Sequence, residues 1–207
     1  MTDINVILFD LGGVLVELTG VATMMSWSNL PEDELWHRWL HSNAVRAFES
    51  GKISEVTFAA DLVSEFELDI SPDTFLRAFV EWPRGPFDGA IDLLESLRDK
   101  YHLACLSNTN HLHWARFESE TRLLSSLDSH FASHLIGIMK PDPEIYHHTI
   151  HSLGCAPAAI LFLDDNPVNV DSARSCGMQS ELVSGISSVQ QTLQRKGLVQ
   201  GFPDANL

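Results

Sequence analysis

Three short runs of apolar residues, far apart in the chain, each end directly in polar residues. The runs are Val6–Phe9, Leu103–Leu106 and Ile160–Leu163. An uninterrupted apolar run of this length, bounded by polar residues or glycine, is typical of a strand that is buried on both faces of a parallel sheet. The polar residues that follow the runs are then expected to lie together at the carboxyl edge of that sheet, where open α/β sheets bind their ligands.

Stretches with helical spacing of apolar residues separate these runs and predict the crossover helices of a parallel sheet. They are Phe87–Lys100, Pro143–Leu153 and Val168–Cys176. Two further short strands are predicted at His134–Ile136 and Gln179–Val183. The alternation of helices with buried strands predicts an α/β fold with a doubly wound, Rossmann-like parallel sheet.

Residues 18–85 interrupt this alternation, because they contain helical patterns and no clear strand. The predicted helices open at Pro31, Ser54 and Pro72. Proline at the first helical position and acidic residues in the first turn are typical helix starts. The sequence therefore predicts a core built from residues 1–17 and 86–207, split by an inserted all-helical cap of residues 18–85.

The charge of the chain limits its partners. There are 28 acidic and 13 basic side chains among 207 residues, a formal net charge of −15. Phosphate backbones and anionic bilayers repel such a surface, so neither a nucleic acid nor a membrane is expected as a partner. No apolar run approaches the roughly 18 residues that span a bilayer, and no basic region typical of a signal peptide is visible. We expect a cytoplasmic protein, and its oligomeric state stays open.

Four polar clusters follow the predicted strands or lie between them, and together they describe a site for phosphoryl transfer. They are Asp10, Ser107–Asn110, Lys140–Pro143 and Asp164–Asn166. A carboxylate can attack phosphorus as a nucleophile, and carboxylate oxygens are the ligands that Mg²⁺ prefers. Hydroxyl, amide and ammonium groups can hold the phosphoryl oxygens. The adjacent Asp164 and Asp165 indicate a nearby cation, because like charges repel.

These clusters resemble the four motifs of the haloacid dehalogenase superfamily of aspartate-nucleophile hydrolases. The matching segments are Phe9–Leu15, Leu106–Thr109, Lys140–Pro141 and Phe162–Asn166. The resemblance covers essentially the whole chain, including the helical insertion after the first motif, and is closest to the helical-cap phosphatase branch. The segment Phe48–Ser54 adds to the similarity. The resemblance implies Mg²⁺ as the cofactor and a small phosphorylated metabolite as the substrate.

The resemblance also implies which residues act on the phosphoryl group. Asp10 corresponds to the nucleophile, which forms an aspartyl-phosphate. Ser107 and Asn108 correspond to residues that bind the phosphoryl group, and Lys140 to the residue that neutralises both Asp10 and the phosphate.

A second set of residues is implied to hold the metal. Asp10 is implied as a ligand of Mg²⁺ as well as the nucleophile, and Asp165 as the main second carboxylate, with Asp164 beside it acting directly or through water. The backbone carbonyl of Gly12 is a further implied ligand, and Asn169 a supporting residue behind the acidic pair.

The chain departs from the family pattern at Gly12, where most phosphatases of this family carry a second Asp that acts as general acid and base. Such catalysis contributes about 10²–10⁴-fold, so a slow enzyme or a substitute group is expected. The candidates for that substitute are Glu17, Glu49 and Lys52, with solvated surface charge as the alternative interpretation of all three. Some members of the resembled branch also carry glycine here, so an active enzyme is still expected.

We therefore expect Mg²⁺-dependent hydrolysis of a small phosphomonoester, such as a sugar phosphate, through an aspartyl-phosphate. Three alternatives stay open. A 2-haloacid dehalogenase needs no metal, so the pair Asp164 and Asp165 argues against it;. A phosphonoacetaldehyde-type hydrolase would use Lys52, the one lysine of the insertion, to form a Schiff base. A regulatory module that binds a phosphoryl group without turnover is the third.

Overall fold

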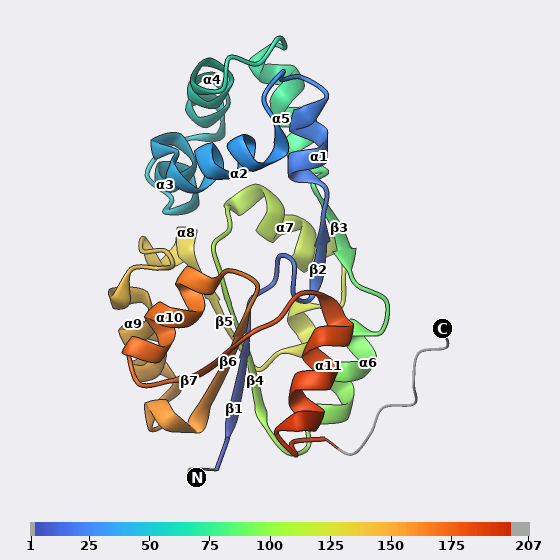
Figure 1. Ribbon diagram of the computed structural model, residues 1–207, viewed down its shortest axis with the longest axis vertical. Helices are drawn as coiled ribbons and strands as arrows, with labels where there is room; N and C mark the ends of the chain where they lie inside the picture. Colours follow the sequence, from blue (N-terminus) through green and yellow to red (C-terminus); the bar gives the residue numbers. More distant parts are fainter. Residues whose placement is uncertain (1–2, 200–207) are drawn as a thin grey trace.

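The computed structural model describes residues 3–199 and contains a five-stranded, fully parallel sheet (Figure 1). In spatial order its strands are β5 (Ser129–Ala132), β4 (His102–Ser107), β1 (Val6–Phe9), β6 (Ile160–Asp164) and β7 (Gln179–Leu182). From β1 the chain moves outward to β4 and β5, and then returns to form β6 and β7 on the other side of β1. The switch point therefore lies between β1 and β6, where doubly wound sheets bind ligands.

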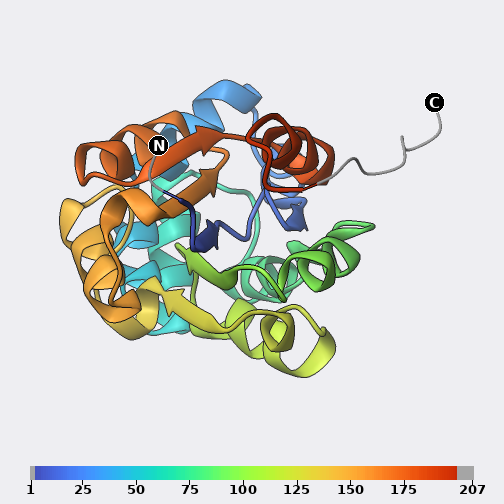
Figure 2. The same cartoon turned by 90° about the horizontal axis from the view of Figure 1, so that it is seen from below.

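Helices cover both faces of this sheet (Figure 2). They are α6 (Ala90–Leu97), α7 (His111–Glu120), α8 (Ser133–Ile136), α9 (Pro143–Leu153), α10 (Pro167–Ser175) and α11 (Gly185–Arg195), with 3-10 turns at Leu124–Ser126 and Pro157–Ala159. Alternate residues of β1 enter two different clusters: Ile7 and Phe9 pack with α6, α7 and α11, whereas Val6 and Leu8 pack with α9 and α10. This double coverage explains why the strands read as uninterrupted apolar runs.

The strand predicted at His134–Ile136 is wrong. Those residues belong to the one-turn helix α8, which Gly137 ends at a φ of 82°, and the strand β5 lies directly before it. Ile136 packs into the core, but Leu135 is 70% exposed, which an interior strand would not allow. A short apolar run does not distinguish a strand from a helical turn, so the pattern alone could not decide.

The insertion consists of five helices above the carboxyl edge of the sheet (Figure 1). They are α1 (Gly20–Met25), α2 (Glu32–His41), α3 (Asn43–Glu49), α4 (Glu55–Glu65) and α5 (Pro72–Val80). Ser42, Ser54 and Ser71 cap α3, α4 and α5, since each hydroxyl accepts a hydrogen bond from a backbone N–H of the first turn;. A cluster of buried aromatic side chains, with Phe48 and Phe58 stacked at 4.2 Å, gives the insertion a core of its own.

A two-stranded antiparallel ribbon joins the insertion to the core. Its strands are β2 (Val16–Leu18) and β3 (Pro83–Pro86). The expectation that residues 18–85 contain no strand is therefore wrong for β3. The sequence Pro-Arg-Gly-Pro disfavours a strand, and only the tertiary pairing with β2 produces one. Within residues 3–199, no helix is long and apolar enough to cross a bilayer.

Candidate active site

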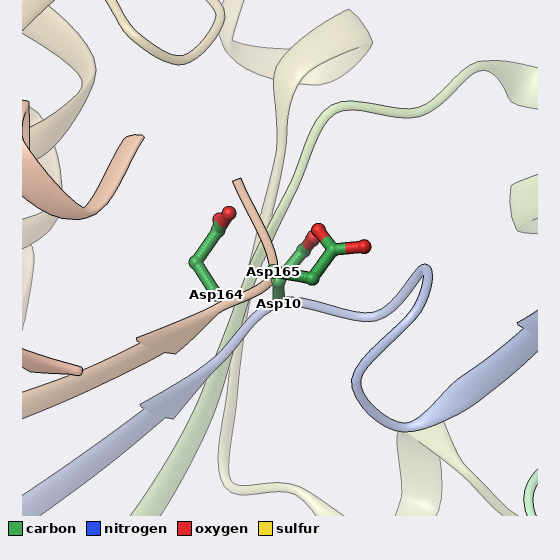
Figure 3. Close-up of side chains that lie close together, drawn as sticks. All are labelled: Asp10, Asp164 and Asp165. Atoms are coloured by element: carbon green, nitrogen blue, oxygen red, sulfur yellow. The ribbon is translucent and has the colours of Figure 1, made fainter. Parts of the chain in front are cut away.

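Three carboxylates meet at the switch point of the sheet (Figure 3). Asp10 follows β1, where its N–H donates to the carbonyl of Leu163 at 2.8 Å, and Asp164 and Asp165 stand at the end of β6. One oxygen of each carboxylate lies within 4.8 Å of the others. Asp10 and Asp164 are buried, whereas Asp165 is exposed. Three clustered carboxylate oxygens are a donor set that suits a hard cation such as Mg²⁺.

Lys140 is the positive charge of this cluster. It is 2% exposed, and its Nζ lies 2.9 Å from Oδ1 of Asp10 and 2.6 Å from Oδ2 of Asp164. Burial alone would lower the pKa of the ammonium, but these two carboxylates outweigh burial and raise the pKa of Lys140 above its usual value. One ammonium against three carboxylates leaves a net charge of about −2, which a divalent cation would neutralise.

The buried carboxylate of Asp10 is held in one orientation. Its Oδ1 accepts hydrogen bonds from the N–H of Leu11 at 2.7 Å and from Lys140. Burial, together with the neighbouring carboxylates and against the opposing charge of Lys140, raises the pKa of Asp10 to about 8. Although Asp165 is exposed as a residue, protein atoms shield its carboxyl group from part of the solvent, and this shielding and the charge of Asp164 raise the pKa of Asp165 to about 6. Both carboxyls are therefore in an environment that favours a proton or a cation.

Asp164 is saturated by protein donors. In addition to Lys140, it accepts hydrogen bonds from the N–H of Asn166 at 2.8 Å and from Nδ2 of Asn169 at 3.0 and 3.2 Å. Tyr146 donates its hydroxyl to the carbonyl of Asn169 and so fixes the backbone there. The structure thus places Asn169, on α10, in contact with Asp164. Asp164 has fewer free lone pairs than Asp10 or Asp165.

The side chain of Asn108 binds the backbone of Lys140. Its side-chain amide donates to the carbonyl of Lys140 at 2.9 Å, and its Oδ1 accepts from the N–H of Lys140 at 2.8 Å. Both ends of the amide are therefore engaged in holding Lys140 in place. Ser107 is buried at the end of β4, and the one hydrogen bond of its hydroxyl among the described residues is a long 3.5 Å contact with the carbonyl of Asn108. The hydroxyl is therefore available to a phosphoryl oxygen.

Two glycines shape the turn after Asp10. A Cβ on Gly12 would lie 2.7 Å from Cδ1 of Leu18, so the Leu18 side chain covers this position. Gly13 has a φ of 71°, and a Cβ there would lie 2.1 Å from Oδ2 of Asp165. The Asp165 carboxylate therefore rests directly on the backbone of Gly13, which only a residue without a side chain permits.

We predict that Gly13→Ala weakens Mg²⁺ binding by about 10–100-fold, because the new methyl displaces the Asp165 carboxylate;. Isothermal titration calorimetry with MgCl₂ measures the effect. Gly89→Ala is the matched control, since Gly89 has a similar φ of 81° and nothing within 4 Å of its Cβ position. If Gly13→Ala binds Mg²⁺ as tightly as Gly89→Ala and the wild type do, Asp165 does not hold the metal.

Ser133 joins the core to the insertion and was not found by sequence reasoning. It is fully buried, and its hydroxyl donates to the carbonyl of Glu49 at 2.6 Å and accepts from the N–H of Thr109 at 2.9 Å. A serine outside every motif carries no signal of its own. Ser133 can make these contacts because the fold brings the loop after β4 and the end of α3 next to α8.

The three predicted substitutes for a second Asp lie in different places. Glu17 is exposed on β2 and lines a cavity of about 400 Å³ with Phe87, Asp88 and Ser184–Ser187. Lys52 is exposed and lines a cavity of about 410 Å³ with Arg46 and Asp142, between the insertion and the loop that carries Lys140. Glu49 is half-buried, and the charge of Lys140 acts on its carboxyl.

Comparison with known proteins yields one family and several relatives. The haloacid dehalogenase-like hydrolase family matches residues 4–177. D-Ribitol-5-phosphate phosphatase of Bacteroides thetaiotaomicron is 26% identical over 84% of this chain and 89% of its own length. Flavin mononucleotide hydrolase 1 of Arabidopsis thaliana is 28% identical over 96% of this chain and 80% of its own length.

A solved structure shares the fold. It is a HAD family enzyme of Bacteroides thetaiotaomicron in complex with magnesium and inorganic phosphate. The TM-score is 0.71 at 23% identity, and the match covers 87% of this chain and 94% of the other. The comparison confirms the predicted α/β, Rossmann-like fold.

Proposed function

Because this chain belongs to the haloacid dehalogenase-like hydrolases, we propose that it is a Mg²⁺-dependent phosphatase that hydrolyses a small phosphomonoester. The observation that carries the proposal is the buried array in which Lys140 bridges Asp10 and Asp164, with Asp165 beside them. The array combines a nucleophile, an ammonium and a set of metal ligands at one edge of the sheet. The two curated relatives named above are both hydrolases of phosphate esters, which supports the same chemistry.

Asp10 is the proposed nucleophile. Its carboxylate oxygen forms a bond to phosphorus while the ester oxygen leaves, which produces an aspartyl-phosphate that water then hydrolyses. Lys140 and the hydroxyl of Ser107 bind the phosphoryl oxygens, and Asn108 positions Lys140 through its backbone. Such preorganised donors stabilise the charge that develops in the transition state.

Asp10, Asp165 and the carbonyl of Gly12 are the proposed ligands of Mg²⁺, with Asp164 held beside them by Lys140 and Asn169. When bound, Mg²⁺ supplies positive charge to the phosphoryl oxygens. The net charge of −15 makes this local positive charge necessary for anion binding;. A small metabolite in the cytoplasm, such as a sugar phosphate, is the proposed substrate, rather than a nucleic acid.

We further propose that the helical insertion acts as a cap over the site. Polar contacts connect it to the core: Arg46 pairs with Asp142, Glu55 lies 3.4 Å from His111, and Ser133 holds the carbonyl of Glu49. Polar contacts of this kind can break and reform as a cap opens for substrate and closes to exclude water.

The proposal predicts phosphate release from a panel of phosphorylated metabolites in the presence of Mg²⁺. Removal of the metal with EDTA is expected to lower the rate by about 10³-fold, because charge stabilisation by a bound metal contributes several kcal/mol. Calorimetry should also show that inorganic phosphate binds the Mg²⁺-loaded protein and hardly binds the metal-free one. Binding of phosphate without hydrolysis of any ester would favour the regulatory module, and a Lys52 adduct after borohydride treatment with phosphonoacetaldehyde would favour the Schiff-base alternative.

A further inference from the structure

We propose that Glu49 is the general acid and base of this enzyme, a role that rests on the phosphatase function proposed above. The chain needs such a group, because Gly12 has no side chain and Leu18 covers its Cβ position. Attack by Asp10 in line with the leaving oxygen places that oxygen on the far side of phosphorus. The helical insertion lies above this edge of the sheet (Figure 1), so a leaving oxygen on the side of phosphorus away from Asp10 would face the insertion.

The backbone of Glu49 is fixed against the core at this edge of the sheet. Glu49 is the last residue of α3, and its carbonyl accepts a hydrogen bond of 2.6 Å from the buried Ser133 hydroxyl. Two residues later, Gly51 lies so close to α8 that a Cβ would be 2.5 Å from the carbonyl of His134. An ion pair from Arg46 to Asp142 ties the same helix to the start of α9.

The environment of the Glu49 carboxyl leaves it able to give or take a proton. It is partly buried, and within residues 3–199 it takes part in no hydrogen bond or ion pair. On the elements around it, Arg46 binds Asp142, His111 faces Glu55, and the buried Nδ1 of His134 on α8 has no hydrogen-bond partner among the described residues. Lys140, which also holds Asp10, is the charge that acts on it.

Burial raises the pKa of Glu49 to about 7, with Lys140 opposing the rise. A group with a pKa near the working pH serves equally well as acid and as base. In the first step the Glu49 carboxyl gives its proton to the ester oxygen as the P–O bond breaks and the bond to Asp10 forms. In the second step the Glu49 carboxylate takes a proton from water, whose oxygen attacks phosphorus and releases Asp10 and hydrogen phosphate.

The test compares Glu49→Gln with the wild type on two substrates, phenyl phosphate and p-nitrophenyl phosphate. The p-nitrophenolate ion leaves without a proton, whereas phenolate requires one. We expect kcat/KM for phenyl phosphate to fall by about 10²–10⁴-fold and to lose its decline above about pH 7. For p-nitrophenyl phosphate we expect a much smaller fall in kcat/KM. Rapid mixing should show a burst of one p-nitrophenol per enzyme molecule, since hydrolysis of the aspartyl-phosphate is now slow.

Two controls separate this role from a structural one. Glu32→Gln removes an exposed glutamate carboxylate of the same insertion and should leave kcat/KM for both substrates unchanged. The midpoint of thermal unfolding of Glu49→Gln should be close to that of the wild type, because within residues 3–199 the carboxyl has no hydrogen bond or ion pair to lose. Equal losses on both substrates without a burst would overturn the role of Glu49. Failure of the wild type to hydrolyse either ester would instead overturn the phosphatase function.

Discussion

Asp10→Asn is expected to lower phosphate release by about 10⁴-fold or more, since loss of the nucleophile removes the covalent route. Asparagine keeps an oxygen where Oδ1 of Asp10 accepts hydrogen bonds from the N–H of Leu11 and from Lys140. Its amide cannot form an acyl phosphate. The fold should therefore survive while turnover is lost, and circular dichroism with phosphate-release kinetics measures both.

The same substitution should change how stability depends on pH. The folded protein raises the pKa of Asp10 to about 8, above the usual carboxyl value, so the native state binds this proton more tightly than the unfolded chain. Stability from this group is therefore present at low pH and is lost as the pH rises towards about 8;. Because asparagine does not titrate, the stability of Asp10→Asn should lack this contribution to the pH dependence. Urea unfolding in EDTA at several pH values measures this pH dependence of stability. The role of Asp10 as the nucleophile would be overturned if Asp10→Asn hydrolysed substrate at the wild-type rate.

The parts of the site at strand ends could be predicted from the sequence. β1 and β6 are apolar throughout because helices cover both faces of the sheet, and this pattern locates Asp10 and Asp164 at their carboxyl ends. Parallel strands bring those ends to one edge, so residues more than 150 positions apart are expected together;. The motif resemblance then assigned roles that the pattern alone does not give.

The supporting residues could not be predicted in this way. Asn108 binds the backbone of Lys140, and Ser133 binds the carbonyl of Glu49. Both contacts depend on how loops pack against each other, and loop packing produces no periodic pattern of residues in the sequence.

The helices α7 and α11 were also missed. Only Trp114 and Phe117 of α7 are buried, so the apolar stripe of that helix is weak;. In α11, by contrast, Ile186, Val189 and Leu193 follow helical spacing and pack into the core, so the pattern could have predicted that helix;.

Lys140→Met is expected to lower the free energy of unfolding of the metal-free protein by about 3–5 kcal/mol, because it leaves the buried carboxylates of Asp10 and Asp164 without their partner;. Methionine has a similar length, so packing is largely preserved. The pKa of Lys140 is raised above its usual value, so the ammonium stays charged in the wild type throughout the neutral range. Any pH dependence there comes from the carboxylates.

Without Lys140 the pKa of Asp10 should rise further, and protonation of Asp10 should relieve part of the unpaired charge;. The deficit in stability is therefore expected to be largest at alkaline pH, to shrink as the pH falls, and to shrink on addition of Mg²⁺, which supplies positive charge at the same place. Lys100→Met, at an exposed lysine, is the control and should change stability by less than about 0.5 kcal/mol;. If Lys140→Met is as stable as this control in EDTA, the three-residue array does not hold the site together as the geometry indicates.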